Sequence, residues 1–550
     1  MKLSERYLPL VILVVCALIF LPHLGVLPIN IMEARNFITA REMIQDQNWI
    51  LTTFNGEPRY EKPPLPTWIT AISAGIFGLE NVAALRLPAV FMAFTLAYFT
   101  YLLGLRISHA PRYSLHSVLI LVTSFYILWA GRNGQWDIFT HGFMMIAIYQ
   151  FYRLFTEDQK TWQHAILTGI FLGFSFMSKG PVSLYALFLP FLIAFGWTFR
   201  FGRRGSGDRT QRTGPVIIMI LITLVVSGWW HLYIYFFDTQ AAKAITAKEV
   251  NNWNSYNVRP FYYYWNFFIQ SGTWAIISVV GLIYPYLKDR VFDKRGYQFT
   301  LIWTLGAVIL LSLIPEKKPR YLLPVLIPLA MNTGFYLEYI ITEFRSAKFK
   351  IGEKIPVWLQ FGLVGIVGIC IPFGGYWYLQ DLLDGYWIWF ILLSVSLFVV
   401  GLGIMRALIR SLIGLAFYLT IVFTCALVLF GLPLSEALSD NPQYKSFSQL
   451  RHWQDSTGLT VYEFEEASPE MIWDYGTQLP VLADDNTYLF PHDSAFGVLA
   501  YEILEKEVRA HFKDYHVQKI GYFDLSPRGR QQGGHKGRLY RDLYLITKEQ

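Results

Sequence analysis

Charged residues are scarce in this chain. Only 15% of its 550 residues are Asp, Glu, Lys or Arg, whereas a soluble globular domain carries about 25%. Hydrophobic residues make up 54% of the chain and aromatic residues 17%. Apolar runs recur from Leu8 to about Leu432, and each has about 20 residues, the length that crosses a bilayer. The composition excludes a soluble protein with a single anchor and predicts a polytopic α-helical membrane protein.

Cysteine is also scarce, and its positions argue against a disulfide framework. Cys16, Cys370 and Cys425 each lie within an apolar run, where we expect them to act as packing residues. A small-x-small cleavage site is missing after the first apolar run, which is long for a signal peptide, so we expect a retained first span. The formal charge of +7 does not indicate a nucleic-acid partner, because Lys and Arg of membrane proteins concentrate in cytoplasmic loops.

Hydropathy predicts roughly thirteen membrane-spanning helices. They cover residues 8–27, 82–105, 114–131, 138–155, 163–178, 181–199, 214–236, 273–287, 298–314, 321–342, 355–378, 385–405 and 411–432. The apolar run Thr67–Gly78 is too short to cross, and Pro63, Pro64 and Pro66 prevent a helix from extending upstream. We therefore predict a re-entrant or interfacial helix there.

Loop charge supports this exclusion. With the N-terminus inside, nearly all predicted cytoplasmic loops are basic, as the positive-inside rule requires, and the loop 200–213 is the clearest case. Counting 67–78 as a crossing would turn every later basic loop outward.

The predicted outer loops nevertheless contain many cations. These are Arg35, Arg41, Arg59, Lys62, Arg132, Lys179, Lys243, Lys248, Arg259, Lys317, Lys318 and Arg320. Such a departure from the positive-inside rule needs a reason. The simplest is an anionic ligand at the outer face, and phosphate is the obvious candidate.

The tail changes to the composition of a soluble domain. Residues 459–466, 518–525 and 539–546 are typical of strands, and Ala495–Phe512 is typical of an amphipathic helix. We therefore expect a membrane domain at 1–432 and a small periplasmic α/β domain at 433–550. The basic segment "RGRQQGGHKGR", residues 528–538, is interpreted as a flexible hairpin loop, with a glycan- or phosphate-binding loop as the alternative.

The first outer loop, 28–81, begins with a predicted helix at 31–44 that Asn30 can cap. An apolar stripe suggests that this helix lies flat on the membrane surface. Glu33 falls in its first turn, where the helix dipole favours a carboxylate that can act as a base or bind a cation. The alternative is a helix-capping acid that pairs with Arg35 or Lys62.

Six motifs give the chain a resemblance to a known family. They are "MEARNFITAREM" from Met32, "GEPRYEKPPLPTW" from Gly56, "LRLPAV" from Leu85, "GRNGQWDIF" from Gly131, "SKGP" from Ser178 and "KKPRYLLPVLIP" from Lys317. In this order and spacing they resemble the polyprenyl-phosphate-sugar-dependent GT-C glycosyltransferases, particularly the lipid A aminoarabinose transferases and bacterial protein mannosyltransferases. The motifs cover about residues 5–340. Beyond them, only the architecture is similar.

The resemblance implies an enzyme of the bacterial inner membrane with its active site facing the periplasm. It would move a sugar, with inversion, from undecaprenyl phosphate to a lipid A-like lipid, a glycan or a protein. Lys62 and Arg320 would bind the donor phosphate, with Tyr321, Arg35 and Lys179 in support. They would stabilise the charge that builds on the leaving phosphate.

The acidic residues have more than one interpretation. Glu61 would lie beside the donor phosphate next to Lys62. Asp137 is a candidate catalytic acid at the outer end of a span, and its alternative role is to pair with Arg132 or Lys179.

The sequence also departs from the family's pattern. Where relatives carry an Asp-Glu pair, this chain has Met32 before Glu33. Either Glu33 or Asp137 then acts as the base, or the acceptor is a phosphate that needs none. Relatives place a His after an acid in a later outer loop, but here Val250 follows Glu249, which argues against a bound zinc. No cofactor is certain, and Glu61 is the candidate ligand if a divalent cation binds.

A polytopic transporter or lipid flippase is the alternative function. Such a protein is expected to have ionisable residues near the middle of the bilayer. The predicted spans have few of them, and the charges gather at one interface. This distribution favours an enzyme acting on a lipid headgroup over a transporter, and a non-catalytic scaffold would leave the clustered charges unexplained.

Overall fold

The computed structural model describes residues 5–201, 210–346, 349–439, 441–484, 487–531 and 533–548. It divides into two compact units, each described by itself. Unit 1 comprises Met1–Gly25, Tyr60–Ile69 and Glu80–Pro433. Unit 2 comprises Val26–Arg59, Thr70–Leu79 and Leu434–Gln550. Residues of the first outer loop therefore belong to the same unit as the tail. The predicted domain boundary at 432/433 stays a prediction.

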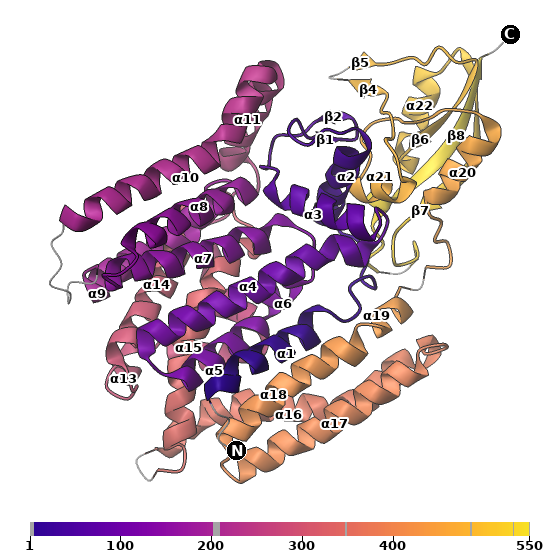
Figure 1. Ribbon diagram of the computed structural model, residues 1–550. Helices are drawn as coiled ribbons and strands as arrows, with labels where there is room; N and C mark the ends of the chain where they lie inside the picture. Colours follow the sequence, from indigo (N-terminus) through magenta and orange to yellow (C-terminus); the bar gives the residue numbers. More distant parts are fainter. Residues whose placement is uncertain are drawn as a thin grey trace. The chain divides into compact units, whose positions relative to one another are not determined.

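Unit 1 is helical (Figure 1). Its helices are α1 Leu8–Phe20, α4 Val82–Ser108, α5 Pro111–Val122, α6 Phe125–Gly131, α7 Trp136–Thr156, α8 Thr161–Lys179, α9 Leu189–Phe199, α10 Thr210–Phe237, α11 Thr239–Ser255, α12 Ala275–Gly281, α13 Tyr284–Leu287, α14 Lys294–Leu313, α15 Leu323–Glu343, α16 Ile351–Leu379, α17 Trp387–Ile409 and α18 Ile413–Ala426. The helix α3, Leu65–Phe77, begins in unit 1 and ends in unit 2. It coincides with the short apolar run that the sequence predicted not to cross the membrane.

Seven helices in the described part of the chain are long and apolar enough to cross a membrane. A bent pair, α5 and α6, raises the number to eight, because the two helices meet at 72° and could form one broken span. The predicted span 273–287 is divided between the short helices α12 and α13. The predicted number of thirteen spans stays a prediction.

The helices that carry or follow the motifs of Asp137, Lys179 and Arg320 pack within unit 1. Helix α7 packs against α8 and α4, α8 packs against α10, and α15 packs against α5 and α14. Gly169 and Gly173 of α8 allow the close approach of α10, since a Cβ atom at Gly169 would lie 2.7 Å from the carbonyl oxygen of Met219. Small residues at this spacing are the usual means by which membrane helices pack closely.

Unit 2 is built on a four-stranded sheet with the order β3-β6-β8-β7. The strands are β3 Val461–Glu463, β6 Ala495–Ala500, β7 Tyr515–Asp524 and β8 Tyr540–Lys548. β3 and β6 run parallel, and the other pairs are antiparallel. The remaining elements are α2 Ile31–Gln45, β1 Thr53–Phe54, β2 Glu57–Pro58, α19 Leu434–Ala437, α20 Ser448–Thr457, α21 Pro469–Tyr475, β4 Ala483–Asp484, β5 Thr487–Tyr488 and α22 Glu505–His511.

The sheet confirms the three predicted strands of the tail and corrects the predicted helix. Ala495–Ala500 is the strand β6, and only Glu505–His511 forms the helix α22. The physical reason is that β6 pairs on both sides, with β3 and β8, and Phe496 to Ala500 are buried. An apolar segment of six residues is ambiguous between a strand and a buried helix when only its sequence is known.

The helix α2 confirms the predicted helix of the first outer loop but not its predicted exposure. Asn30 caps it, accepting hydrogen bonds from the backbone of Met32 at 3.0 Å and of Glu33 at 3.3 Å. Most of its residues between Glu33 and Met43 are buried, and Ala34 and Ile38 belong to a core with Phe447 and other residues of the tail. Helix α2 packs against α21 within the unit, and its predicted position flat on the membrane surface stays a prediction.

Candidate functional site

Asp137 and Lys179 form a buried ion pair in unit 1. Asp137 lies in the first turn of α7 and is 3% exposed, and Lys179 is the last residue of α8 and is 8% exposed. The Lys179 Nζ donates a hydrogen bond to Asp137 Oδ1. Each helix dipole favours the charge at its end, because acids are stabilised at N-termini and cations at C-termini. Gly180 ends α8 with a φ of +71°, a conformation that suits glycine.

Tyr321 and Arg320 lie beside this ion pair. The Lys179 Nζ lies 5.3 Å from the centre of the Tyr321 ring, and the guanidinium carbon of Arg320 lies 6.0 Å from the same ring. Arg320 also interacts electrostatically with both Asp137 and Lys179. Its Nε is buried and has no hydrogen-bond partner among the described residues. Arg320 therefore keeps a buried donor available beside a cluster that already contains Lys179.

Lys62 belongs to the same cluster. It interacts electrostatically with Lys179, and its Nζ lies 3.4 Å from Glu249 Oε2 of α11. The preceding Tyr60 donates a hydrogen bond of 2.7 Å to Asp238, which fixes the chain before the prolines. Burial is the largest cause that raises the pKa of Tyr60 well above its ordinary value, and this hydrogen bond is the second. The structure thus gathers Lys62, Arg320, Lys179, Tyr321 and Asp137 in one unit.

The turn before Arg320 adds residues that sequence reasoning did not assign to the site. Glu316 accepts a hydrogen bond of 3.2 Å from the Tyr321 hydroxyl and pairs with Lys318 at 2.5 Å. Lys317 has a different role. It is 3% exposed, and its Nζ donates hydrogen bonds to the backbone carbonyls of Arg259, at 3.0 Å, and Ile314. Burial lowers the pKa of Lys317. Lys317 is therefore a structural residue of the turn.

Three acids contact residues of the cluster or of the chain beside it, and the sequence did not assign them to the site. Glu249 and Asp238 pair with Lys62 and Tyr60, which are distant in the chain. Glu316 lies close to Arg320 in the sequence, within the segment "PEKKPRY". The predicted alternative partner of Asp137, Arg132, instead donates hydrogen bonds to the backbone carbonyls of Ile19, at 2.7 Å, and Pro22.

Glu61 is a weak candidate for a metal ligand. Its Oε2 is buried without a hydrogen-bond partner among the described residues. However, the described part of the chain contains no group of three or more His, Cys, Asp or Glu side chains that could hold a metal ion. The residues present therefore do not fit a resident cation held by several protein ligands, and Glu61 as a cation ligand stays a prediction.

Glu33 and Arg35 belong to unit 2. Glu33 Oε2 accepts hydrogen bonds from Asn30, at 2.7 Å from the side-chain amide and 3.3 Å from the backbone. This reciprocal arrangement is a capping box, which agrees with the predicted capping role of Glu33. The backbone carbonyl of Arg35 accepts a hydrogen bond of 2.6 Å from Arg59. Their predicted roles as base and phosphate ligand stay predictions.

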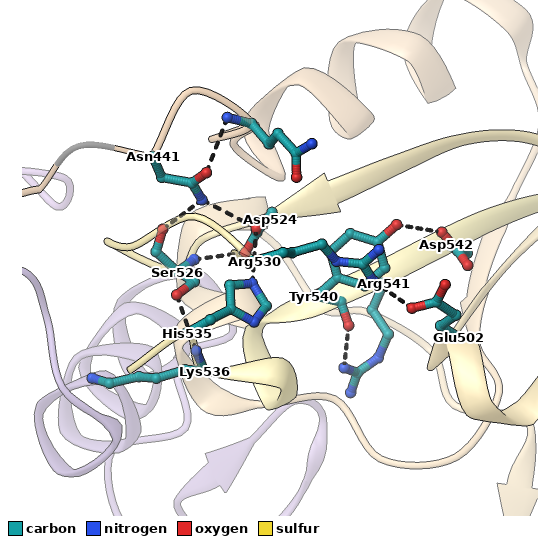
Figure 2. Close-up of polar contacts among 11 residues, drawn as sticks. Asn441, Glu502, Asp524, Ser526, Arg530, His535, Lys536, Tyr540, Arg541 and Asp542 are labelled. Carbon is teal, nitrogen blue, oxygen red and sulfur yellow. Dashed lines mark hydrogen bonds and ion pairs between the residues drawn. The ribbon is translucent and has the colours of Figure 1, made fainter. Parts of the chain in front are cut away.

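The basic loop between β7 and β8 uses most of its side chains to hold the tail together. Arg530 pairs with Glu502 at 2.5 Å, and Arg538 pairs with Glu470 at 2.5 Å. Figure 2 shows His535 directed at Asp524, whose buried carboxylate also accepts a hydrogen bond from Asn441. These contacts favour the interpretation as a hairpin loop over a phosphate-binding loop. Residue 532 lies outside the described residues.

The arrangement in unit 1 can bind a phosphate and stabilise negative charge on it. Lys179 interacts electrostatically with Lys62 and Arg320, and Asp137 is a buried acid paired with Lys179. Just before Asp137, Gln135 is buried with neither amide atom of its side chain bonded to a described residue. Buried polar groups without partners are rare in proteins, and a polar ligand would satisfy them.

Comparisons with known proteins agree with this chemistry. Residues 61–230 match a family described as dolichyl-phosphate-mannose-protein mannosyltransferase. An undecaprenyl phosphate-alpha-4-amino-4-deoxy-L-arabinose arabinosyl transferase of Pseudomonas savastanoi is 25% identical over 351 residues, which cover 61% of this chain and 62% of the relative. An uncharacterized protein of Aquifex aeolicus is 25% identical over 54% of this chain and 57% of its own length. The chain thus matches about three fifths of these relatives, and the resemblance predicted from the motifs is confirmed.

The fold matches that of a solved crystal structure over nearly the whole chain. The crystal structure of ArnT from Cupriavidus metallidurans bound to undecaprenyl phosphate matches with a TM-score of 0.69 at 15% identity, covering 98% of this chain and 97% of that one. The same protein in the apo state matches with a TM-score of 0.67. The predicted fold class, a polytopic helical membrane protein of GT-C type with a small C-terminal α/β part, is confirmed.

Proposed function

We propose that this chain is a membrane glycosyltransferase that moves a sugar from a polyprenyl-phosphate carrier to an acceptor. The observation that carries the proposal is the cluster of Lys62, Lys179 and Arg320 in unit 1, in which Lys179 is paired with the buried Asp137. The fold and the matched family support it, since the ArnT structure was solved with undecaprenyl phosphate.

The reaction breaks the bond between the anomeric carbon and the phosphate oxygen of the donor. An acceptor oxygen attacks the anomeric carbon from the opposite side, so the configuration inverts, and the bonding electron pair leaves on the phosphate. Lys62 and Arg320 stabilise this growing charge, and preorganised charges of this kind usually provide the largest part of catalysis. Tyr321 packs against Lys179 and, with Asp137, fixes its ammonium group.

The acceptor determines whether a base is required. A phosphate acceptor is already anionic near pH 7 and can attack directly, whereas the hydroxyl of a glycan or protein must lose its proton. Glu33 and Asp137 are the two candidate bases, with Arg35 an additional phosphate ligand. Both carboxylates are engaged in the structure, Asp137 with Lys179 and Glu33 with Asn30, which favours an acceptor that needs no base. A lipid A-like phosphate is the acceptor that best suits a site with few free carboxylates.

The proposed location is the bacterial inner membrane, with the cluster and the tail facing the periplasm. The chain is a multi-pass membrane protein with the ArnT fold. The inner loops predicted from the sequence are basic, which supports this orientation through the positive-inside rule.

Transfer by the purified full-length protein tests the proposal. The assay supplies an undecaprenyl-phosphate-linked aminoarabinose and a lipid A acceptor, and mass spectrometry measures the modified product. We expect Lys62→Ala to lower the rate by about 10²–10³-fold, the usual cost of removing one stabilising group. The matched control is Glu57→Gln, an exposed residue of β2. Wild-type rates in Lys62→Ala, with inserted and folded protein, would contradict the proposal.

A further inference from the structure

A second charged cavity lies at the far end of α15 from the candidate site. Tyr321 and Arg320 directly precede α15, and Glu338 and Glu343 lie in its last turns. Twenty residues of α-helix span about 30 Å, the thickness of the hydrocarbon layer of a bilayer. The cavity is therefore a full membrane thickness from the phosphate cluster and belongs to the opposite interface.

The cavity is half-open and has a volume of about 370 Å³. This lies within the range of about 300–1,000 Å³ that is typical of small-molecule sites. Charged side chains of both signs line it, from the N-terminal segment, the start of α5, the turn after α13 and the end of α15. They are Glu5, Arg112, Arg290, Glu338 and Glu343. Three of these four segments fall in loops that the sequence predicts to be cytoplasmic.

Some of these charges are fixed by the protein and others are available. Glu338 Oε1 is held by His116 Nδ1 at 2.5 Å, and His116 Nε2 contacts the Tyr418 hydroxyl at 2.9 Å. Arg290 pairs with Glu353 at 3.3 Å. Among the described ion pairs, none includes Arg112 or Glu343. The cavity thus presents one guanidinium, Arg112, and two carboxylates, Glu5 and Glu343, that no described ion pair engages.

A ligand with only one sign of charge would satisfy half of this lining. An anion would pair with Arg112 but would approach Glu338 and Glu343, and a cation would have the reverse difficulty. A zwitterion satisfies both, because each of its ends meets an opposite charge with hydrogen bonds that ionised groups strengthen. The rings of Tyr113, Phe292 and Tyr339 complete the lining with apolar surface. The predicted cytoplasmic loops place this end of the helices at the headgroup level, where zwitterionic lipids expose their polar ends.

We propose that this cavity binds a phosphoethanolamine group, supplied by a membrane phospholipid. Arg112 would bind the phosphate, and Glu343, with Glu338, would accept hydrogen bonds from the primary ammonium. Choline lacks N–H donors and glycerol lacks the positive charge, so phosphatidylcholine and phosphatidylglycerol would bind less well. The proposal does not depend on the proposed glycosyltransferase activity.

Native mass spectrometry of the full-length protein tests this site. The protein, purified in detergent, is titrated with phosphatidylethanolamine, phosphatidylcholine or phosphatidylglycerol of identical acyl chains, and the bound lipid is counted. We expect phosphatidylethanolamine to bind best, and Arg112→Gln combined with Glu343→Gln to weaken it by about tenfold or more, the cost of losing charged hydrogen bonds. The matched control is Lys294→Gln, whose exposed pairing with Asp289 lies outside the cavity.

Two outcomes would overturn the proposal. One is equal retention of the three lipids by the wild-type protein, and the other is unchanged retention of phosphatidylethanolamine by the double variant. Free O-phosphoethanolamine separates the two sources of the group. Displacement of the lipid at millimolar concentration would assign the cavity to a soluble ligand and overturn the lipid source, whereas no displacement supports the lipid. Unfolding temperatures of wild type and variants show whether the double variant is folded.

Discussion

The pair of Asp137 and Lys179 connects stability with function at the scale of single residues. Both side chains are almost fully buried, yet both are charged and hydrogen-bonded to each other. Removing one member of such a pair leaves an uncompensated buried charge, whereas removing both need not be costly. The pair therefore holds the Lys179 ammonium in place for a bound anion.

A double-mutant cycle tests this dual role. We expect Lys179→Met to lower the free energy of unfolding by about 3–5 kcal/mol, because Asp137 loses its partner. The double variant Asp137→Asn with Lys179→Met should recover most of that loss while remaining inactive in transfer. Unfolding of the purified protein, followed by tryptophan fluorescence on heating, measures the stability. Equal losses in the single and double variants would show that the pair does not act as a unit.

Several site residues could be predicted from the sequence because their charge is unusual for their position. Lys62, Lys179 and Arg320 are cations in loops that should be poor in cations, and the structure places them together. Glu249 and Asp238 were not identified because their partners, Lys62 and Tyr60, are far away in the chain. Pairing between distant residues depends on packing that no local pattern encodes.

At the scale of helices, the contact between α8 and α10 positions Lys179. A Cβ atom at Gly173 would lie 2.5 Å from the side chain of Val226, and one at Gly169 would meet the backbone of α10. Any side chain there must push the helices apart.

Glycine substitutions test this contact. We expect Gly169→Ala to lower the unfolding free energy by about 1–3 kcal/mol, the usual cost of overpacking, and to reduce transfer because α8 carries Lys179. The matched control is Gly228→Ala in α10, where a Cβ atom meets nothing within 4 Å. Thermal unfolding and the transfer assay should both separate the two variants. A Gly169→Ala protein as stable and active as the Gly228→Ala protein would contradict the close-packing interpretation.

Helices with an uninterrupted apolar run were predicted well, whereas the span that bends in the structure was not. Helices α4, α7, α8 and α10 agree with their predicted spans within a few residues. The predicted span 114–131 is instead bent by 72° between α5 and α6, with Thr123 and Ser124 at the break. Hydropathy records how apolar a segment is, but not where its backbone changes direction.

At the scale of the whole molecule, unit 2 contains a buried acid that should make stability depend on pH. Burial raises the pKa of Glu463 to about 7, although the adjacent Arg541 favours the ionised form. An acid with a raised pKa keeps its proton in the folded state after the unfolded chain has lost it. Stability should therefore fall as the pH rises from about 4.5 to about 7 and then level off.

Substitution of this acid tests the pH dependence. We expect Glu463→Gln to remove a large part of the decrease in unfolding temperature between pH 5 and pH 8, since glutamine does not titrate. Glu57→Gln, an exposed position in the same unit, should leave the decrease unchanged. Differential scanning fluorimetry across the pH range measures both variants. An identical pH profile in wild type and Glu463→Gln would contradict the assignment.

Labelling of single cysteines tests the proposed orientation of the whole chain. In a protein with Cys16, Cys370 and Cys425 replaced by Ser, we expect a cysteine at Glu57 to react with a membrane-impermeant maleimide in intact spheroplasts. A cysteine at Lys160, in a predicted cytoplasmic loop, should react only after lysis. The reverse pattern would invert the proposed topology.

The core that Ala34 and Ile38 complete also restricts which substitutions this chain can accept. Arg41 of α2 donates hydrogen bonds to backbone carbonyls near Trp473, 432 positions later. Substitutions in α2 and in the tail are therefore expected to depend on one another. A chimaera that takes its first loop from one species and its tail from another would combine two halves of different cores, however similar their membrane helices are.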